Sequence, residues 1–171
     1  LMDMKGNAGS LVKMLAADLA YEIKNPDTFE IFYQPQYDNN DKCVSAEGLL
    51  RWNHPLCGII YPPLVIGLAT ETGLLGQLER IVFQNSCKDL RTMRENNVEI
   101  DVISVNVTAA TLQSDGFVEF LTNLRHEYPE IENHLCIELT ENMSFLIDER
   151  TEERFATIHN MGFTFAIDDF S

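Results

Sequence analysis

The chain has 171 residues, of which 45% are hydrophobic and 23% are charged, a composition typical of a globular domain and not of a disordered segment. Its net charge is −15, and its 12 Lys and Arg residues are spread along the sequence, which argues against a binding groove for DNA or RNA polymers. An acidic protein can still bind a phosphodiester when a divalent cation lies between its carboxylates and the phosphate. The charge therefore permits a metal-dependent phosphate enzyme without identifying one.

Localisation follows from segments that the sequence lacks. No apolar run approaches the roughly 20 residues of a membrane helix, and no signal peptide is recognisable. The sequence begins at Leu1 without an initiator Met, so we expect a piece of a longer protein, either soluble or membrane-anchored. None of the four cysteines belongs to a CxxC pair, and Cys43 and Cys136 fall inside strand-like runs. Reduced core thiols in a cytoplasmic domain are the better interpretation.

The first half of the chain predicts a helix, two strands and two further helices. Ser10 can cap the first helix, whose apolar stripe stops before Pro26. The first strand is interrupted by Pro35, which has no N–H to donate to the backbone hydrogen bonds of a sheet. The second predicted helix ends at Gly73, and the third predicted helix is the longest. In order, the predicted ranges are 10–25, 29–38, 43–52, 62–73 and 74–96.

The second half alternates regularly between strands and helices. Thr108 begins a helical segment, and Asp148 can cap another that Gly162 ends. In order, the predicted ranges are 102–107, 108–124, 135–141, 149–161 and 163–170. Alternation with a period of about 30 residues predicts parallel βα units.

The two faces of each predicted strand help to choose between a barrel and an open sheet. In "VISVNV", Ile103, Val105 and Val107 share one face, and Ser104 and Asn106 share the other. The strands "LCIELTE" and "FTFAIDD" also have one bulky apolar face and one face of small or polar residues. A doubly wound sheet is apolar on both faces, because helices cover both. A barrel turns one face inward, where polar groups near the strand ends form the site, so the pattern favours a barrel.

The polar residues on these inward faces form a candidate metal site. Glu47, Asn106, Glu138 and Asp168 lie towards the carboxyl ends of four successive strands, where barrel enzymes place their active sites. Three carboxylates and one amide oxygen suit Mg²⁺, Mn²⁺ or Ca²⁺ and not zinc. A single acid at a strand end is usually a loop-facing or capping residue, but four in phase are harder to dismiss. Asp169 can turn towards a second cation, as in two-metal phosphodiesterases.

The chain contains, in this order, the segments "YQP", "AEGLLRW", "ISVNVTAATL", "ELTE" and "IDDF". These segments resemble those of one family, the EAL domains, which hydrolyse the bacterial messenger cyclic di-GMP. They follow the family's order and spacing from about Ser10 to the end of the chain. One departure is Gly48, which stands where the family's name has alanine.

The resemblance implies a modified (β/α)8 TIM-type barrel, an α/β fold whose first strand is antiparallel to the rest. We expect residues 1–25 to be a helical connector and residues 26–171 to be an EAL domain that is incomplete at its C-terminus, with about five of the strands present. A lysine of the next strand and a later glutamate and glutamine would be missing, and Ser171 stands where the family usually has glycine. An open barrel leaves unpaired strand edges, so we expect residues 1–171 alone neither to fold as a monomer nor to hydrolyse cyclic di-GMP.

The resemblance also implies residue roles. The four in-phase donors would bind the first Mg²⁺ or Mn²⁺ and Asp169 the second, with a bridging water as nucleophile, and Ca²⁺ would inhibit. Arg51 would contact a phosphate, Gln34 would hydrogen-bond the nucleotide and Leu50 would line the ligand groove. Glu141 would steady the loop after the fifth strand. Taken alone, Arg51, Gln34 and Glu141 are better explained as an ordinary surface ion pair, an edge-strand polar residue and a helix-start acid. The order of the motifs favours the functional roles.

Three functions remain open at this point. The first is a metal-dependent phosphodiesterase that opens cyclic di-GMP to linear pGpG. The second is a catalytically inactive EAL domain that acts as a cyclic di-GMP receptor or a protein-interaction module. The third is an unrelated Mg²⁺ barrel enzyme of the enolase type, against which Gln34, "LLRW" and the paired "DD" argue. We also expect a homodimer that binds no nucleic-acid polymer, in a protein that includes a GGDEF or sensory domain.

Overall fold

The computed structural model describes residues 2–140 and 148–167, with side chains from residue 8 onward. By their internal packing, the residues divide into two compact units: Leu1–Glu30 with Leu50–Ile81, and Ile31–Leu49 with Val82–Ser171. Three elements run from one unit into the other, namely β1 (Phe29–Tyr37), β2 (Cys43–His54) and α3 (Leu75–Glu95). No described helix is long and apolar enough to cross a bilayer.

The first unit is built mainly from helices around an aromatic centre. Besides parts of the three shared elements, it contains α1 (Met2–Glu22), η1 (Pro26–Thr28), β3 (Gly58–Ile60) and α2 (Pro62–Glu71). Trp52, which is fully buried, stacks on Phe29 at a ring-centroid distance of 6.0 Å. Leu15 and Leu19 of α1 join the same buried cluster. Burial of this apolar surface is the main force that stabilises the unit.

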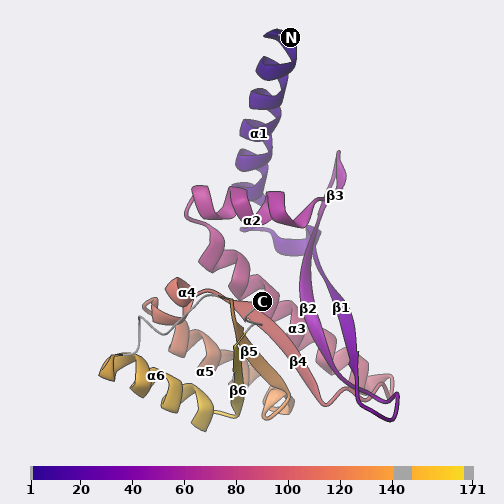
Figure 1. Ribbon diagram of the computed structural model, residues 1–171, viewed down its shortest axis with the longest axis vertical. Coiled ribbons are helices and arrows are strands. Elements are labelled where there is room, and N and C mark those ends of the chain that lie inside the picture. Colours follow the sequence, from indigo (N-terminus) through magenta and orange to yellow (C-terminus); the bar gives the residue numbers. More distant parts are fainter. Residues whose placement is uncertain (1, 141–147, 168–171) are drawn as a thin grey trace. The chain divides into compact units, whose positions relative to one another are not determined.

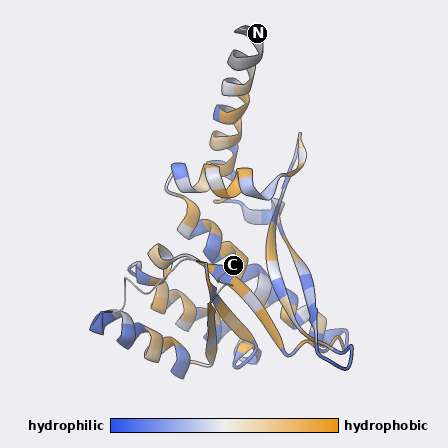
Figure 2. Cartoon of the chain, viewed as in Figure 1, coloured by the Kyte–Doolittle hydropathy of each residue, from blue (hydrophilic) through white to orange (hydrophobic). Residues whose placement is uncertain are grey.

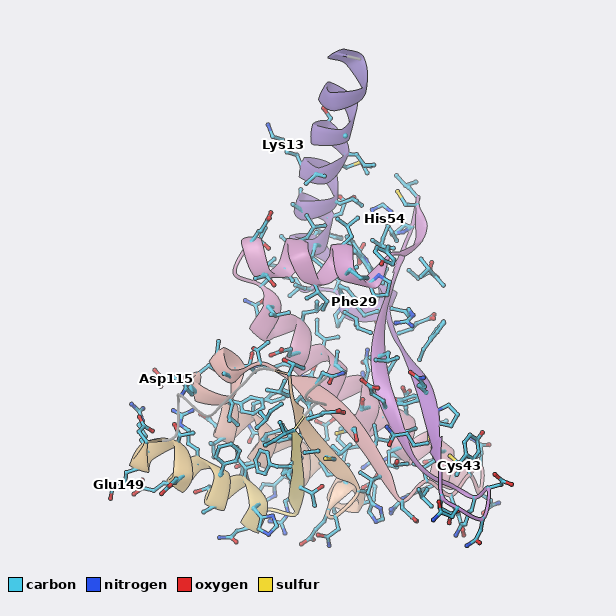
Figure 3. All side chains as sticks on the ribbon, in the orientation of Figure 1. Lys13, Phe29, Cys43, His54, Asp115 and Glu149 are labelled. Atoms are coloured by element: carbon cyan, nitrogen blue, oxygen red, sulfur yellow. The ribbon has the colours of Figure 1, made fainter. Side chains whose placement is uncertain are left out.

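His54 ties α1 to the end of β2 within this unit. The imidazole is 3% exposed, and its Nδ1 accepts the backbone N–H groups of Leu56 and Cys57 at 3.0 and 3.1 Å. Because Nδ1 accepts, the proton of the neutral ring lies on Nε2, which donates to Asp18 Oδ2 at 2.7 Å. Figure 3 labels His54 beside the hairpin that leads into β3. Each nitrogen of this buried ring therefore has a partner.

The second unit has the βα alternation that the sequence predicts. Its own elements are β4 (Val102–Val107), α4 (Ala109–Gln113), α5 (Phe117–Glu127), η2 (Pro129–Ile131), β5 (Leu135–Leu139), α6 (Glu149–Asn160) and β6 (Phe163–Ile167). The sheet order is β1-β2-β4-β5-β6, with β3 paired to β2 (Figure 1). The β1–β2 pair is antiparallel, and β2, β4, β5 and β6 are parallel.

The apolar faces of the strands lie where their alternation predicts. Ile103, Val105, Val107 and Ile137 are fully buried, and the residues between them in β4 are half-buried. In Figure 2, β4 is coloured mostly hydrophobic and α6 mostly hydrophilic, as expected for a central strand and a surface helix. Ile167 is an exception, because it is 60% exposed although its parity matches that of the buried Phe163.

Four details of the sequence-based prediction were wrong or incomplete. Helix α1 begins at Met2, so Ser10 lies inside the helix and does not cap it. The helical segment from Thr108 is two helices, which are separated at Gly116, where φ is +80°, a conformation that glycine adopts at little cost. Strand β3 and the two 3-10 helices were not predicted. Cys43 is not a core thiol, because it is half-buried, whereas Cys136 is buried as expected.

Candidate functional site

One face of the sheet in the second unit carries the polar residues that the sequence singles out. Ser45 Oγ donates to Gln36 Oε1 at 2.7 Å, so these two side chains share a face of the β1–β2 pair. Side chains alternate along a strand, which places Gln34 on the same face of β1 and Glu47 on the same face of β2. Gln34 is exposed and Glu47 is half-buried.

Glu47 is linked to the next strand by a side-chain hydrogen bond. Asn106 Nδ2 donates to Glu47 Oε1 at 2.9 Å. In the strand register, Glu47 lies opposite Ser104, two residues before Asn106, while Asn106 lies directly opposite Glu138. Neighbouring strands of a closed barrel are staggered along their length. Side chains from positions that are not directly opposite, such as Glu47 and Asn106, can therefore lie at the same height along the barrel. Glu47, Asn106 and Glu138 therefore lie on one face of three successive strands.

The chemistry of this set fits a hard divalent cation. All three residues carry oxygen donors and are half-buried, and Mg²⁺ and Mn²⁺ prefer such ligands. The bond between Asn106 and Glu47 uses the amide nitrogen, so it orients the carboxylate without occupying the amide oxygen. Among the described side chains, residues 8–140 and 148–167, no group of three His, Cys, Asp or Glu is close enough to hold a metal.

Three expected site residues cannot be placed. Asp168 and Asp169, the remaining expected metal ligands, and Glu141, the expected loop-steadying residue, lie outside the described residues. The described part of the site therefore contains three of the five expected metal ligands.

Leu50 and Arg51 lie on the part of β2 that belongs to the first unit. Both side chains are half-buried. Leu50 packs against the buried cluster of that unit, and the Arg51 Nη1 donates to the Leu50 carbonyl at 2.8 Å. Their expected roles in binding a phosphate and lining a groove remain predictions.

The opposite face of the β1–β2 pair contains a polar contact that the sequence reasoning missed. Tyr33 Oη donates to Asp89 Oδ2, on α3, at 2.6 Å. Burial, together with the hydrogen bond to Asp89, raises the pKa of Tyr33 well above its ordinary value. Tyr33 has the same parity as the buried Ile31, a signal that it faces a helix, but nothing local in the sequence identifies Asp89 as its partner.

Comparison with known families identifies the class of protein. Residues 16–171 match the EAL domain family, which is the family of cyclic di-GMP phosphodiesterases. This match covers most of the chain, and the chain therefore belongs to the EAL-domain family. Members of this family typically use divalent metals.

Two curated relatives show the extent of the likeness. The oxygen sensor protein DosP of Escherichia coli K12 is 30% identical over 158 residues, which are 92% of this chain and 20% of DosP. The cyclic di-GMP phosphodiesterase PA2567 of Pseudomonas aeruginosa is 27% identical over 157 residues, which are 91% of this chain and 27% of PA2567. The chain thus spans less than a third of either relative.

Solved structures confirm the fold. The PaMucR phosphodiesterase in complex with c-di-GMP superposes with a TM-score of 0.79 at 26% identity, over 92% of this chain and 64% of PaMucR. The S helix-GGDEF-EAL region of Vibrio cholerae LapD, bound to c-di-GMP, gives a TM-score of 0.74 at 16% identity, over 92% of this chain and 38% of that one. The prediction of an EAL-type modified barrel with an antiparallel first strand is confirmed.

Proposed function

We propose that the protein containing this chain is a metal-dependent phosphodiesterase that hydrolyses cyclic di-GMP to linear pGpG. The observation that carries the proposal is the Asn106–Glu47 hydrogen bond at 2.9 Å, with Glu138 in register beside it. Membership of the EAL family supports the choice of substrate, as does the complex of PaMucR with c-di-GMP.

Each described residue has a definite task in this proposal. Glu47, Asn106 and Glu138 would hold Mg²⁺ or Mn²⁺, together with Asp168, and Asp169 would contribute to a second cation. When bound, two such cations lower the pKa of a water molecule and stabilise the charge that develops on the phosphate. The Asn106 amide fixes the rotamer of Glu47, so one oxygen of that carboxylate is held before any cation arrives. Pre-orientation of this kind reduces the reorganisation needed for catalysis.

The groups around the substrate are assigned from the family. Gln34 would hydrogen-bond the nucleotide, and its exposed position on the face of Glu47 supports this role. Arg51 would contact a phosphate, Leu50 would line the groove, and Glu141 would steady the loop after β5. Arginine suits a phosphate contact because its planar guanidinium can donate two parallel hydrogen bonds.

The wider organisation of the protein is also a proposal. Residues 1–25, which include α1, would connect the EAL domain, residues 26–171, to a sensory or GGDEF region of a longer cytoplasmic or membrane-anchored protein. The GGDEF-EAL arrangement of LapD and the small share of DosP that the chain spans support this view. We propose a homodimer as the working assembly, which light scattering of the full-length protein tests.

The experiment is hydrolysis of cyclic di-GMP by full-length wild-type protein and by Glu47→Gln, with Glu99→Gln as a matched control. Glu99 is exposed in the loop before β4, so its variant makes the same chemical change away from the site. Loss of the Glu47 charge should lower the rate on the order of a hundredfold or more, because metal-assisted transition-state stabilisation is worth several kcal/mol.

The ion dependence gives a second readout of the same proposal. Mg²⁺ and Mn²⁺ should support turnover, whereas Ca²⁺, which tolerates irregular geometry, should bind without supporting it. Wild-type turnover in Glu47→Gln, or full turnover in Ca²⁺ alone, would contradict the proposal. Tight binding of cyclic di-GMP by wild-type protein without hydrolysis in any of the three ions would indicate a receptor instead.

A further inference from the structure

Gln34 lies on a strand that has one described neighbour, and it directly precedes a proline. The next residue is Pro35, which has no N–H to donate to a strand ladder. Strand β1 is also at one end of the strand order, with β2 as its only neighbour among the described strands. A side chain that recognises a ligand must nevertheless be held to within about 0.5 Å of its productive position, so other contacts have to fix this stretch.

Two side-chain hydrogen bonds, one on each side of Gln34 and Pro35, provide such contacts. Tyr33 Oη donates to Asp89 Oδ2 at 2.6 Å and fastens β1 to α3 on one face. Ser45 Oγ donates to Gln36 Oε1 at 2.7 Å and fastens β1 to β2 on the other face. All of these residues belong to the second unit. The backbone is therefore held from both faces within the four consecutive positions 33–36, which include Gln34.

The Tyr33–Asp89 bond is the stronger of the two on physical grounds. A hydroxyl that donates to a carboxylate makes a short, charge-assisted bond, about twice as strong as one between neutral groups. The contact is partly buried, which reduces competition from water. The raised pKa of Tyr33 means that the phenol keeps its proton, and so remains a donor, throughout the neutral range.

We propose that Tyr33 and Asp89 are positioning residues that hold the Gln34 side chain in place for the nucleotide. This inference rests on the proposed function, because it requires Gln34 to bind cyclic di-GMP. Loss of the Tyr33 hydroxyl frees β1 from α3 next to Pro35, and Gln34 then samples orientations that do not meet the ligand. The effect acts on ligand affinity more than on the chemical step, because Gln34 is not among the metal ligands.

The test is a double-mutant cycle between Tyr33→Phe and Gln34→Ala in the full-length protein. The dissociation constant for cyclic di-GMP is measured by calorimetry in Ca²⁺, and KM and kcat are measured in Mg²⁺. Tyr33→Phe should raise the dissociation constant and KM by about fivefold to tenfold and change kcat much less. In the Gln34→Ala background, the same substitution should have no further effect on affinity. Tyr37→Phe is the matched control, because Tyr37 is on the same strand and 62% exposed.

A second pair of variants keeps the inference testable if Tyr33→Phe does not fold. Asp89→Asn retains an acceptor for the Tyr33 hydroxyl and should preserve more affinity than Asp89→Ala, while thermal unfolding reports their stabilities separately. The inference is overturned, and the proposed function stands, if Gln34→Ala weakens binding but Tyr33→Phe does not. The same conclusion follows if the effects of the two substitutions on the binding free energy are fully additive. If wild-type protein does not bind cyclic di-GMP, or Gln34→Ala leaves affinity unchanged, the proposed role of Gln34 fails and the inference fails with it.

Discussion

The packing around Gly48 of β2 predicts how much the substitution Gly48→Ala changes the stability of the protein. A Cβ atom added at this position would lie 3.2 Å from Ile31 Cγ2, and 3.5 Å from both the Ser86 Oγ and the carbonyl oxygen of Ser104. The first distance is shorter than an ordinary contact between carbon atoms, whose optimum is about 3.5–4.0 Å. Gly48→Ala therefore requires Ile31 to move by a few tenths of an ångström in a tightly packed layer.

Two opposing effects determine the change in the free energy of unfolding caused by Gly48→Ala. Overpacking of a buried site costs about 1–3 kcal/mol, whereas replacing glycine restricts the unfolded chain and stabilises by about 0.4–1 kcal/mol. Because Ile31 is only 8% exposed and the χ1 angle of its β-branched side chain is restricted, we expect the overpacking cost to exceed the entropic gain. The net effect of Gly48→Ala should be a destabilisation of about 1 kcal/mol.

The assay is urea unfolding of the full-length protein with Ile31→Leu and the double variant included. Leucine keeps the volume of isoleucine but has no Cγ2 methyl group, so the double variant should recover most of the stability lost by Gly48→Ala. Gly67→Ala is the matched control: Gly67 lies in α2 with nothing within 4 Å of its added Cβ, and alanine should stabilise that helix by about 0.5–1 kcal/mol. If Gly48→Ala stabilises the protein as Gly67→Ala does, the packing argument is wrong.

Two further predictions concern hydrogen bonds accepted by aspartate side chains. The Asp148 carboxylate accepts the Thr151 N–H at 2.8 Å. Hydrogen bonds from the Thr151 side chain and backbone lower the pKa of Asp148 below its ordinary value of 3.8. The stabilisation by Asp148 is therefore fully present above pH 3.8 and is lost as the pH falls through the lowered pKa. Asp148→Asn should accordingly unfold at a lower urea concentration than wild type at neutral pH and at nearly the same concentration in strong acid; a difference that persists in acid would refute the assignment. Asp18→Ala removes the acceptor of the buried His54 Nε2–H and should cost about 1 kcal/mol, the low end for an orphaned donor, because the Asp18 side chain is 39% exposed and water can replace it. Asp18→Asn, measured by the same unfolding assay, should lose less; equal losses would show that the hydrogen bond is not what matters.

The sequence by itself determined the five longer strands and the face on which Glu47, Asn106 and Glu138 lie. Alternation along "VISVNV" places Val105 and Asn106 on opposite sides of β4. A shift of one residue in the pairing of this strand would turn its buried valine and isoleucine side chains towards solvent, so the register is well specified. The capping role of Asp148 was also readable, because an N-cap depends on residues within one helical turn. The order of the motifs was sufficient to predict the EAL-type barrel that the comparisons confirm.

Features that depend on distant parts of the chain were decided only by the tertiary structure. Asp89 meets Tyr33 across 56 positions, and nothing within one turn of α3 distinguishes it from a solvated helical acid. Strand β3 is three residues long and exists because it pairs with β2, which a pattern of so few residues cannot indicate. The hydrogen bond from Asn106 to Glu47 likewise depends on the register of β2 against β4. Periodicity reports the face of a strand on which a side chain lies, but the partner that it meets is set by how the strands and helices pack.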